Sequence, residues 1–379
     1  MNDRVYLDWN ATAPLRAEAR EAMANAFDCV GNPSSVHFEG RAARRIVEDA
    51  RQQVATALGA EARNVIFTSG GTESNALALQ PALLGADTKP FDRLIVSAIE
   101  HVSVLAGGRF DRSAIELAPV TPDGMIDLAA LRELVAGKPR ALVSVMLANN
   151  ETGVIQPVRE VTAIVHDAGG LLHVDAVQAL GKIAIDIRAL GADIVSVSAH
   201  KLGGPKGIGA VAFSADAAAL QPLLRGGGQE RNRRAGTENV VGIAGFGAAV
   251  AAALASLEGE LEHLTRLRNR LEQGLSARGD VTIFGRQAPR LPNTTLFAAP
   301  EMRAETAVIA FDLDGVAVSS GSACSSGKVT PSHVLKAMGV ERDLVQGAIR
   351  LSSGYSTTDA EIDRCLEAWR KLSSVLGKR

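Results

Sequence analysis

Three side chains that could do chemistry each follow a short apolar run: His101, Asp175 and Lys201. Lys201 enters the glycine- and proline-rich stretch 202–207, where desolvation would push its amine toward the neutral, nucleophilic form. Asp175 ends its apolar run, and a buried carboxylate needs a partner. His101 could stack on a ring or move a proton. Each also has a structural alternative: a solvated lysine, a helix-capping aspartate, or a histidine bonded to a backbone carbonyl.

Two loops add polar groups to this set. Loop 69–75, Ser-Gly-Gly-Thr-Glu-Ser-Asn, can bring backbone amides close to a phosphate, and Thr72 could cap the following helix. The loop lacks the Gly-Lys-Ser/Thr ending of a nucleotide P-loop, and an ordinary helix start is the alternative. In loop 148–153, Asn149 and Asn150 either bind something or build a turn. A phosphate cradle, a histidine, an aspartate and a lysine are together what pyridoxal phosphate requires.

The three cysteines have different surroundings. Cys324 lies in the Gly/Ser-rich segment 318–327, which predicts an exposed thiol on a mobile arm that can reach into a site. A loop cysteine that serine could replace is the alternative. Cys29 and Cys365 lie in helical patterns and are expected to fill core space. An odd number of cysteines in so long a chain excludes a disulfide framework and favours a reducing compartment.

Arg350 is a charge within the apolar run 347–352, and this context favours a fixed clamp for a carboxylate over a solvated side chain.

Short apolar runs with helical stretches between them must position these residues. Their rhythm predicts an α/β fold with a mainly parallel sheet covered on both faces. Ligands of such sheets bind at the carboxyl ends of the strands, where the polar side chains occur. The predicted strands are residues 64–68, 93–97, 114–117, 141–147, 171–174, 193–198 and 208–213, and the predicted helices include 41–58, 73–84, 128–135 and 158–167.

After Leu257 the pattern changes to a smaller α+β domain. It has a long charged helix, apolar runs at 281–284, 294–298 and 308–311, and a closing helix at 358–376. We therefore expect a large domain over 16–257, and a small domain formed by 1–15 and 258–379 that carries the cysteine segment.

Residues 240–257 contain no charge and have the length of a membrane span. Their alanine- and glycine-rich composition and the missing aromatic belt instead predict the buried first half of a long helix. The whole chain of 379 residues has 42 acidic and 40 basic side chains, which excludes a general electrostatic case for nucleic acid or an anionic membrane. The charged start shows no signal peptide, so a cytoplasmic location is expected.

Nine segments of the chain form an ordered set of motifs: YLDWNATAP (6–14), GNPSSVHFEGR (31–41), FTSGGTESN (67–75), EHVSV (100–104), NNETG (149–153), HVDAVQALGK (173–182), SAHKLGGPKGIG (198–209), GGGQERNRRAGTENV (226–240) and SSGSACSSGKVTPSHVLKAMG (319–339). In this order they resemble the cysteine desulfurases of the NifS/IscS type, class V of the fold-type-I pyridoxal phosphate enzymes. The resemblance covers almost the whole chain, and the long cysteine segment looks like the NifS/IscS subgroup, not the branch with a shorter loop. Trp9, Ala13 and Asn232 depart from the family pattern.

The resemblance implies chemical roles for five residues. Lys201 would bond the cofactor and move the Cα proton, and His101 would stack on the ring and assist proton transfer. Asp175 would pair with the pyridine nitrogen and Gln178 with the phenolic oxygen. Cys324 would take sulfur as a persulfide.

The resemblance also implies a set of binding residues. The phosphate would be held by Gly71, Thr72, Ser198 and His200 and, from the neighbouring subunit of a homodimer, by Thr237. The substrate would be held by Asn150, which would also face the cofactor, and by Arg350 through its carboxylate.

The implied reaction removes sulfur from L-cysteine and leaves L-alanine. The persulfide would pass to an iron–sulfur scaffold or another acceptor, in general iron–sulfur assembly or in nitrogenase maturation. No resident metal is expected, although Cys324 could be a transient iron–sulfur ligand with a scaffold partner. The alternatives are a selenocysteine lyase, another class-V enzyme such as an aminotransferase, a docking partner without catalysis, and a nucleotide-binding module built on loop 69–75.

Overall fold

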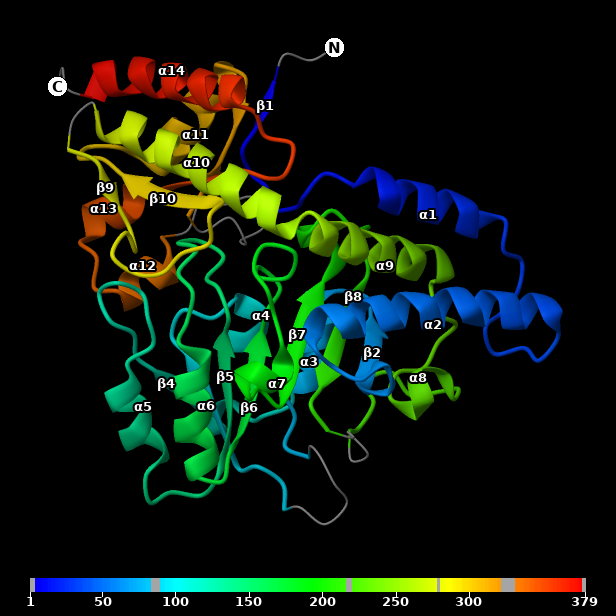
Figure 1. The fold of residues 1–379 in the computed structure, drawn as a ribbon. Coiled ribbons are helices and arrows are strands. Elements are labelled where there is room, and N and C mark those ends of the chain that lie inside the picture. The colour runs from blue at the N-terminus through cyan, green and yellow to red at the C-terminus, as the bar shows by residue number, and fades with distance from the viewer. Residues whose placement is uncertain (1–3, 83–88, 216–219, 278–279, 322–330, 377–379) are drawn as a thin grey trace.

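The computed structural model describes residues 4–82, 89–215, 220–277, 280–321 and 331–376, without the side chains of residues 375 and 376. Figure 1 shows a large sheet in the lower part of the molecule, a smaller layered unit above it, and an arm of helices on the right.

The large sheet has seven strands in the order β2-β8-β7-β6-β5-β3-β4. The five strands β7, β6, β5, β3 and β4 are parallel to one another, whereas β8 is antiparallel to both β2 and β7. This confirms the predicted α/β fold with a mainly parallel sheet. The bounds are β2 (Val65–Thr68), β3 (Arg93–Ser97), β4 (Ile115–Ala118), β5 (Ala141–Met146), β6 (Leu171–Asp175), β7 (Ile194–Ser198) and β8 (Gly209–Phe213).

Both faces of this sheet are covered. Successive side chains of a strand point to opposite faces, and those of β3 enter two different cores. In β3, Ile95 joins the core beneath α2, α6 and α9, whereas Leu94 and Val96 join the core that includes residues of α3 and α4. A strand buried on both faces reads as a mostly apolar run, and β5 is buried along its whole length with Ser144 as its one polar residue. The helices are α2 (Phe38–Leu58), α3 (Gly71–Ala78), α4 (Val102–Leu105), α5 (Leu128–Val135), α6 (Val158–Asp167), α7 (Ile187–Leu190) and α9 (Val240–Ala255).

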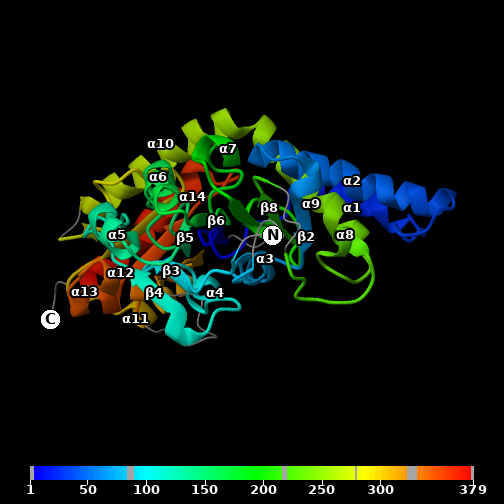
Figure 2. The same cartoon turned by 90° about the horizontal axis from the view of Figure 1, so that it is seen from below.

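An arm of three helices extends from one end of the molecule (Figures 1 and 2). In it α9 packs against both α1 (Ala17–Phe27) and α2. Helix α2 is capped at its start by His37, whose ring accepts a hydrogen bond from the Gly40 amide, and it is followed by Gly59 in the left-handed region (φ 63°). Glycine adopts this conformation without steric cost, so the end of α2 is sharply defined.

A second, four-stranded sheet lies in the upper unit, with the order β12-β13-β10-β9 and antiparallel pairing. The N-terminal strand β1 pairs with β11, and Val5 and Leu7 join the core of this unit. The predicted domain boundaries themselves stay a prediction. The strands are β1 (Val5–Tyr6), β9 (Thr282–Ile283), β10 (Thr294–Ala298), β11 (Val316–Ala317), β12 (Ser319–Ser320) and β13 (Ile349–Ser352), and the helices are α10 (Leu257–Ser276), α11 (Ala304–Leu313), α12 (His333–Ala337), α13 (Arg342–Gly347) and α14 (Asp359–Leu376).

Two expectations about these elements are wrong. Residues 308–311, read as an apolar run among the small-domain strands, lie inside helix α11. The long helix expected from residue 240 is two helices, α9 and α10, with a bend of 72° between them. At the bend the Ser256 hydroxyl lies within hydrogen-bonding distance of both the Ala252 carbonyl and Glu260. A serine that bonds a preceding carbonyl often bends a helix.

The apolar stretch that resembled a membrane span is the core helix α9, with Ile243, Phe246 and Val250 buried. Among the described residues no single helix is long and apolar enough to cross a membrane, and the bent pair α9 and α10 passes that test only when taken together.

The two described cysteines differ from each other. Cys365 is buried in α14, where burial raises the pKa of its thiol to about 12, so it packs as expected. Cys29 lies beyond the end of α1 and is partly exposed, so its predicted role as core filler is wrong.

Candidate active site

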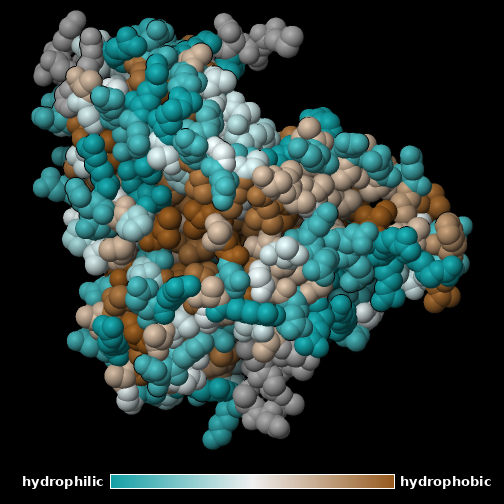
Figure 3. Space-filling view, in the orientation of Figure 1, coloured by the Kyte–Doolittle hydropathy of each residue, from teal (hydrophilic) through white to brown (hydrophobic). Residues whose placement is uncertain are grey.

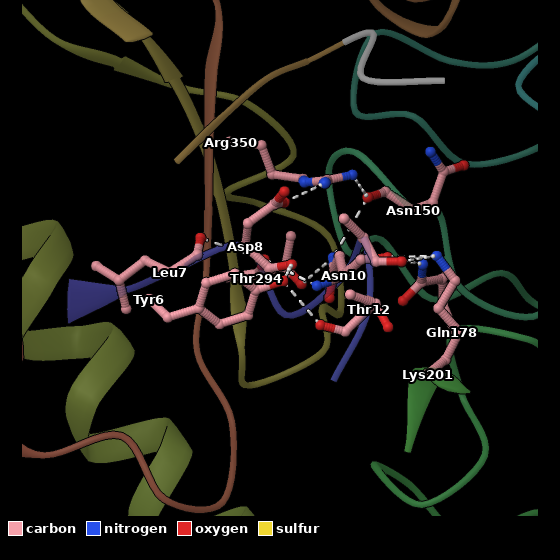
Figure 4. Close-up of polar contacts among 12 residues, drawn as sticks. Tyr6, Leu7, Asp8, Asn10, Thr12, Asn150, Gln178, Lys201, Thr294 and Arg350 are labelled. Atoms are coloured by element: carbon pink, nitrogen blue, oxygen red, sulfur yellow. Dashed lines mark hydrogen bonds and ion pairs between the residues drawn. The ribbon is translucent and has the colours of Figure 1, made fainter. Parts of the chain in front are cut away.

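The carboxyl ends of β5, β6 and β7 open into a cavity of about 290 Å³. Side chains from the N-terminal segment and from β13 of the upper unit close it on the other side (Figure 4). Ten residues that the sequence singled out line this one cavity: Gly71, Thr72, His101, Asn150, Asp175, Gln178, Ser198, His200, Lys201 and Arg350.

Loop 69–75 forms the start of α3, as expected, and its helix begins at Gly71. The residue before the helix is Gly70 (φ 154°), so the expected capping by Thr72 is wrong and the Thr72 side chain lies in the first turn. A Cβ at Gly71 would lie 2.9 Å from a methyl of Val177 and 3.4 Å from the Ser198 Cβ. Glycine at this position therefore keeps room for a ligand beside the first amides of α3, which can bind an anion.

Asp175 ends β6, and both of its carboxylate oxygens are held. Oδ1 accepts from the Val177 amide at 2.9 Å and Oδ2 accepts from the Asn75 side chain at 2.8 Å. Asn75 Nδ2 also donates to the Ser103 hydroxyl at 2.9 Å. A carboxylate fixed in this way at the cavity wall can pair with a cationic ring nitrogen.

His101 stands at the start of α4, with Nδ1 2.7 Å from the Ser103 hydroxyl. The Ser103 amide donates to Nδ1, so this nitrogen is an acceptor and the proton of the neutral ring lies on Nε2. Burial lowers the pKa of His101, with further lowering by Lys201 and His333, while Asp175 opposes this effect. The neutral imidazole is thus favoured beside the cavity.

Lys201 lies in the short helical turn after β7, and its ammonium donates to two backbone carbonyls, Asn10 at 2.6 Å and Ala11 at 2.9 Å. Next to it, burial and the charges of Lys201, Lys206 and Lys182 lower the pKa of His200 to about 4. His200 is therefore neutral at physiological pH.

Arg350 on β13 is buried and held from two sides. Nη2 donates to Asp8 at 2.7 Å, and Nη1 donates to the Asn150 backbone carbonyl at 3.0 Å. Among the described residues neither Arg350 Nε nor the buried Asn150 Oδ1 has a hydrogen-bond partner. A buried polar atom without a partner is costly, which indicates a ligand on this side of the cavity.

Residues that sequence reasoning passed over complete the polar surroundings. Asn10 joins the N-terminal segment to both sides of the cavity, and Lys182 lies behind Gln178. Burial and the charge of Asp175 raise the pKa of Glu100, and burial raises the pKa of Glu151 to about 7. Asn10 lies in the segment 6–14 already singled out, but nothing in that segment marked it apart from its neighbours.

Asn149 builds the turn after β5, because its Oδ1 accepts from the amides of Glu151 and Thr152. Of the two alternatives for these adjacent amides, the turn holds for Asn149, and Asn150 faces the cavity.

Of the other predicted site residues, Thr237 is exposed and does not line the cavity. Cys324 lies outside the described residues. Thr237 follows a turn in which Glu230, Arg231 and Asn232 have positive φ values of 46°, 57° and 65°.

Comparison with known proteins gives the family. A family model described as aminotransferase class-V matches residues 5–365. The chain belongs to this family. Class-V enzymes of this kind depend on pyridoxal 5′-phosphate, so the chain is a pyridoxal phosphate enzyme of fold type I, as predicted.

Individual members of the class-V family are similar over nearly their whole length. The cysteine desulfurase IscS of Dictyoglomus turgidum is 41% identical, covering 99% of this chain and 96% of that protein. A cysteine desulfurase of Cereibacter sphaeroides is 44% identical, covering 96% of this chain and 94% of that one. The solved structure of a NifS-like protein from Rickettsia africae has a TM-score of 0.88 at 36% sequence identity, and the match covers 98% of this chain and 99% of that one.

The cavity fits the class-V cofactor on its own geometry. It brings an amine, a fixed carboxylate and a helix start together in one hollow. Pyridoxal phosphate carries an aldehyde carbon, a ring nitrogen and a phosphate at separate ends of one small molecule. The amine suits the aldehyde carbon, the carboxylate suits the ring nitrogen, and the helix start suits the phosphate.

Proposed function

We propose that this class-V enzyme is a cysteine desulfurase, which converts L-cysteine to L-alanine and keeps the sulfur as a persulfide on Cys324. The observation that carries the proposal is the convergence of Lys201, Asp175 and Arg350 on one cavity, since these groups suit an amino acid bound to pyridoxal phosphate. The names of the full-length relatives support the choice of reaction within the family.

The cofactor, when bound, supplies an electron sink that makes the Cα proton of the substrate removable. We assign its phosphate to the start of α3 with Ser198 and His200, and its ring nitrogen to Asp175. The neutral His101 ring suits a stacking position, since a cation would repel a protonated ring nitrogen nearby. Gln178 is assigned to the phenolic oxygen.

Lys201 is assigned two tasks, the covalent link to the cofactor and proton transfer at Cα. Its amine lies at the mouth of the cavity, held by the Asn10 and Ala11 carbonyls. These contacts place the amine among the residues that line the cavity, where it can reach a bound cofactor.

Arg350 and Asn150 are assigned to the substrate. The Asp8 contact fixes one side of the Arg350 guanidinium, so its remaining N–H groups present a preset orientation to a carboxylate. The partnerless Asn150 Oδ1 is available to accept from the substrate or the cofactor.

The sulfur step is assigned to Cys324. Its thiolate attacks the substrate sulfur, an S–S bond forms, and the Cβ–S bond breaks with its electron pair going to carbon. The carbon fragment gains protons and leaves as alanine, while the enzyme keeps the persulfide. Atoms balance as cysteine plus thiol giving alanine plus persulfide.

We infer two kinds of partner. The persulfide passes to a sulfur acceptor such as an iron–sulfur scaffold, and a second copy of the chain contributes Thr237 to the phosphate site. An exposed apolar patch at the tip of the helical arm, made by Phe27, Val30, Val36 and Phe38, supports an interface with another copy (Figure 3).

The test is the absorbance of the purified protein before and after L-cysteine is added, with alanine and sulfide measured in the presence of a thiol reductant. We expect a visible cofactor band, equal amounts of both products, and no such turnover with L-alanine alone. Cys324→Ser should keep the band and lose sulfide release, and Lys201→Ala should change the band. Products from selenocysteine alone would contradict the assignment in favour of a selenocysteine lyase.

A further inference from the structure

A second lysine lies directly behind the cavity wall. Lys182 Nζ donates to Gln178 Oε1 at 2.9 Å and approaches Asn10 Oδ1 at 3.4 Å. Lys182 itself does not line the cavity, whereas Gln178 does. The lysine therefore contacts the wall from its outer side.

The Gln178 amide is held in one orientation by two neighbours. Its Nε2 donates to the Asn10 carbonyl at 3.0 Å, and its Oε1 accepts from Lys182. A flipped amide would set its oxygen against the Asn10 carbonyl and its N–H groups against the Lys182 amine. The contact with the Asn10 carbonyl would then be repulsive, and so would the contact with a protonated Lys182. Both neighbours therefore specify the same orientation while Lys182 is charged.

Asn10 is a rigid reference point for this arrangement. Its side chain is 1% exposed, donates to Thr294 Oγ1 at 2.9 Å, and accepts from Asn293 Nδ2 at 3.0 Å. The backbone amide of Asn10 donates to Ser352 Oγ at 3.0 Å. Figure 4 shows Asn10 between Thr294 and Gln178.

The charges that face Lys182 are Lys201 and Arg350, both cations. Among the described residues its hydrogen-bond partners are two amide oxygens, and no carboxylate pairs with it. Burial, Lys201 and Arg350 lower the pKa of Lys182 to about 7. The contact with Gln178 survives in both protonation states, because a neutral amine still donates.

We propose that Lys182 is a positioning residue, whose amine holds the Gln178 amide so that an N–H, not the carbonyl oxygen, turns toward the cavity. An amide nitrogen carries two N–H groups, and the Asn10 carbonyl uses one. The proposal rests on the function proposed above, in which the phenolic oxygen of the cofactor accepts from Gln178.

The expected effect is on the pH midpoint at which the visible band of the resting, cofactor-loaded enzyme changes. A hydrogen bond to the phenolic oxygen withdraws its negative charge and makes the neighbouring nitrogen less basic. Loss of the Gln178 donor should therefore raise the midpoint. A hydrogen bond to a charged group corresponds to about 1–2 pH units, and we expect about one unit for the loss of orientation alone.

The experiment is a double-mutant cycle of Lys182→Met and Gln178→Ala, read as this midpoint in the holoenzyme without substrate. Lys182→Arg keeps a donor and a charge, and Lys336→Met removes an exposed lysine on α12 as the matched control. Thermal unfolding of each variant checks that it is folded.

We expect Lys182→Met to raise the midpoint in the wild-type background and to have no further effect in the Gln178→Ala background. Lys182→Arg should restore most of the wild-type value. An equal shift in both backgrounds would show that Lys182 acts through its charge alone and would overturn the proposal, as would no shift at all. A wild-type protein that binds the cofactor and releases sulfide in the same assays keeps these outcomes separate from a failure of the proposed function.

Discussion

Arg350 carries its charge in a buried strand only because Asp8 and the Asn150 carbonyl hold it. Lysine cannot keep both contacts and also present a fork to a carboxylate, so Arg350→Lys should weaken substrate binding. We expect KM for L-cysteine to rise about 10- to 100-fold, equivalent to about 1.5–3 kcal/mol, with a smaller change in kcat.

Steady-state kinetics at several cysteine concentrations measure this split. Arg270→Lys, at an exposed ion pair with Asp363, is the control and should leave KM unchanged. A fall in kcat at unaltered KM would contradict the assignment of Arg350 to the substrate carboxylate.

Glu151 is a buried carboxyl that accepts a hydrogen bond from the Ser332 hydroxyl at 2.5 Å. Its pKa rises from 4.5 to about 7 on folding, so between these values the native state binds more protons than the unfolded state. Stability from this group is therefore present at low pH and is lost as pH rises toward 7 and above. The full loss is on the order of 3 kcal/mol.

Glu151→Gln should remove this dependence. Urea unfolding at pH 5 and pH 8 should show a smaller loss of stability between these two values in the variant than in the wild type. Glu367→Gln, at an exposed position on α14, controls for the loss of one carboxylate. Identical pH slopes in wild type and Glu151→Gln would refute the prediction.

Among the elements, the turn around Glu230 is held by a buried ion pair. Glu230 accepts from Arg51 at 2.6 and 2.9 Å and from the Phe67 amide at 3.0 Å, which fixes the turn to the edge of the large sheet. Three successive non-glycine residues in the left-handed region are costly, and this anchor holds them there.

Asn232 is one of the positions that depart from the family pattern, and its φ of 65° lies in the left-handed region that asparagine tolerates better than most residues. Asn232→Ala should destabilise the protein by about 1 kcal/mol, because alanine tolerates this conformation less well. Asn232→Gly should stay within about 0.5 kcal/mol of the wild type, since relief of strain offsets the entropy of the unfolded chain. Denaturant midpoints decide this, and equal losses for both variants would count against backbone strain.

The strands of the large sheet could be predicted because strands buried on both faces read as mainly apolar or β-branched runs, with isolated polar residues such as Ser144 in β5. The same rule failed at residues 308–311, since four apolar residues do not distinguish a strand from a turn of helix. In α11 Phe311 is buried whereas Ile309 is 60% exposed. The site residues at strand ends could be found from topology alone. Asp8, Asn10, Lys182 and Glu151 could not, because their roles depend on contacts between segments far apart in the chain.

For the whole molecule, the exposed patch at the tip of the helical arm leads to a prediction about assembly. Val36 is 87% exposed and Phe38 72% exposed, which is unusual for clustered apolar side chains of a lone subunit. We expect a dimer by light scattering after gel filtration, and we expect Val36→Asp to weaken it and lower cofactor affinity.

Leu313→Asp changes an equally exposed apolar residue on α11 and is the matched control. A protein that remains a monomer at high concentration, or a dimer unaffected by Val36→Asp, would contradict the placement of the interface on this patch.

The pairing of Asp8 with Arg350 has a consequence for when the enzyme becomes able to bind its substrate during synthesis. These partners are 342 residues apart, so at about 5–20 residues per second roughly 20–70 s of translation separate them. The large sheet can form while the ribosome is still translating the chain. The proposed substrate-binding site is incomplete until β13, which carries Arg350, has been made. A nascent or prematurely terminated chain can therefore fold much of its core and still be unable to bind an amino acid. We expect desulfurase activity to begin only when the polypeptide is nearly complete.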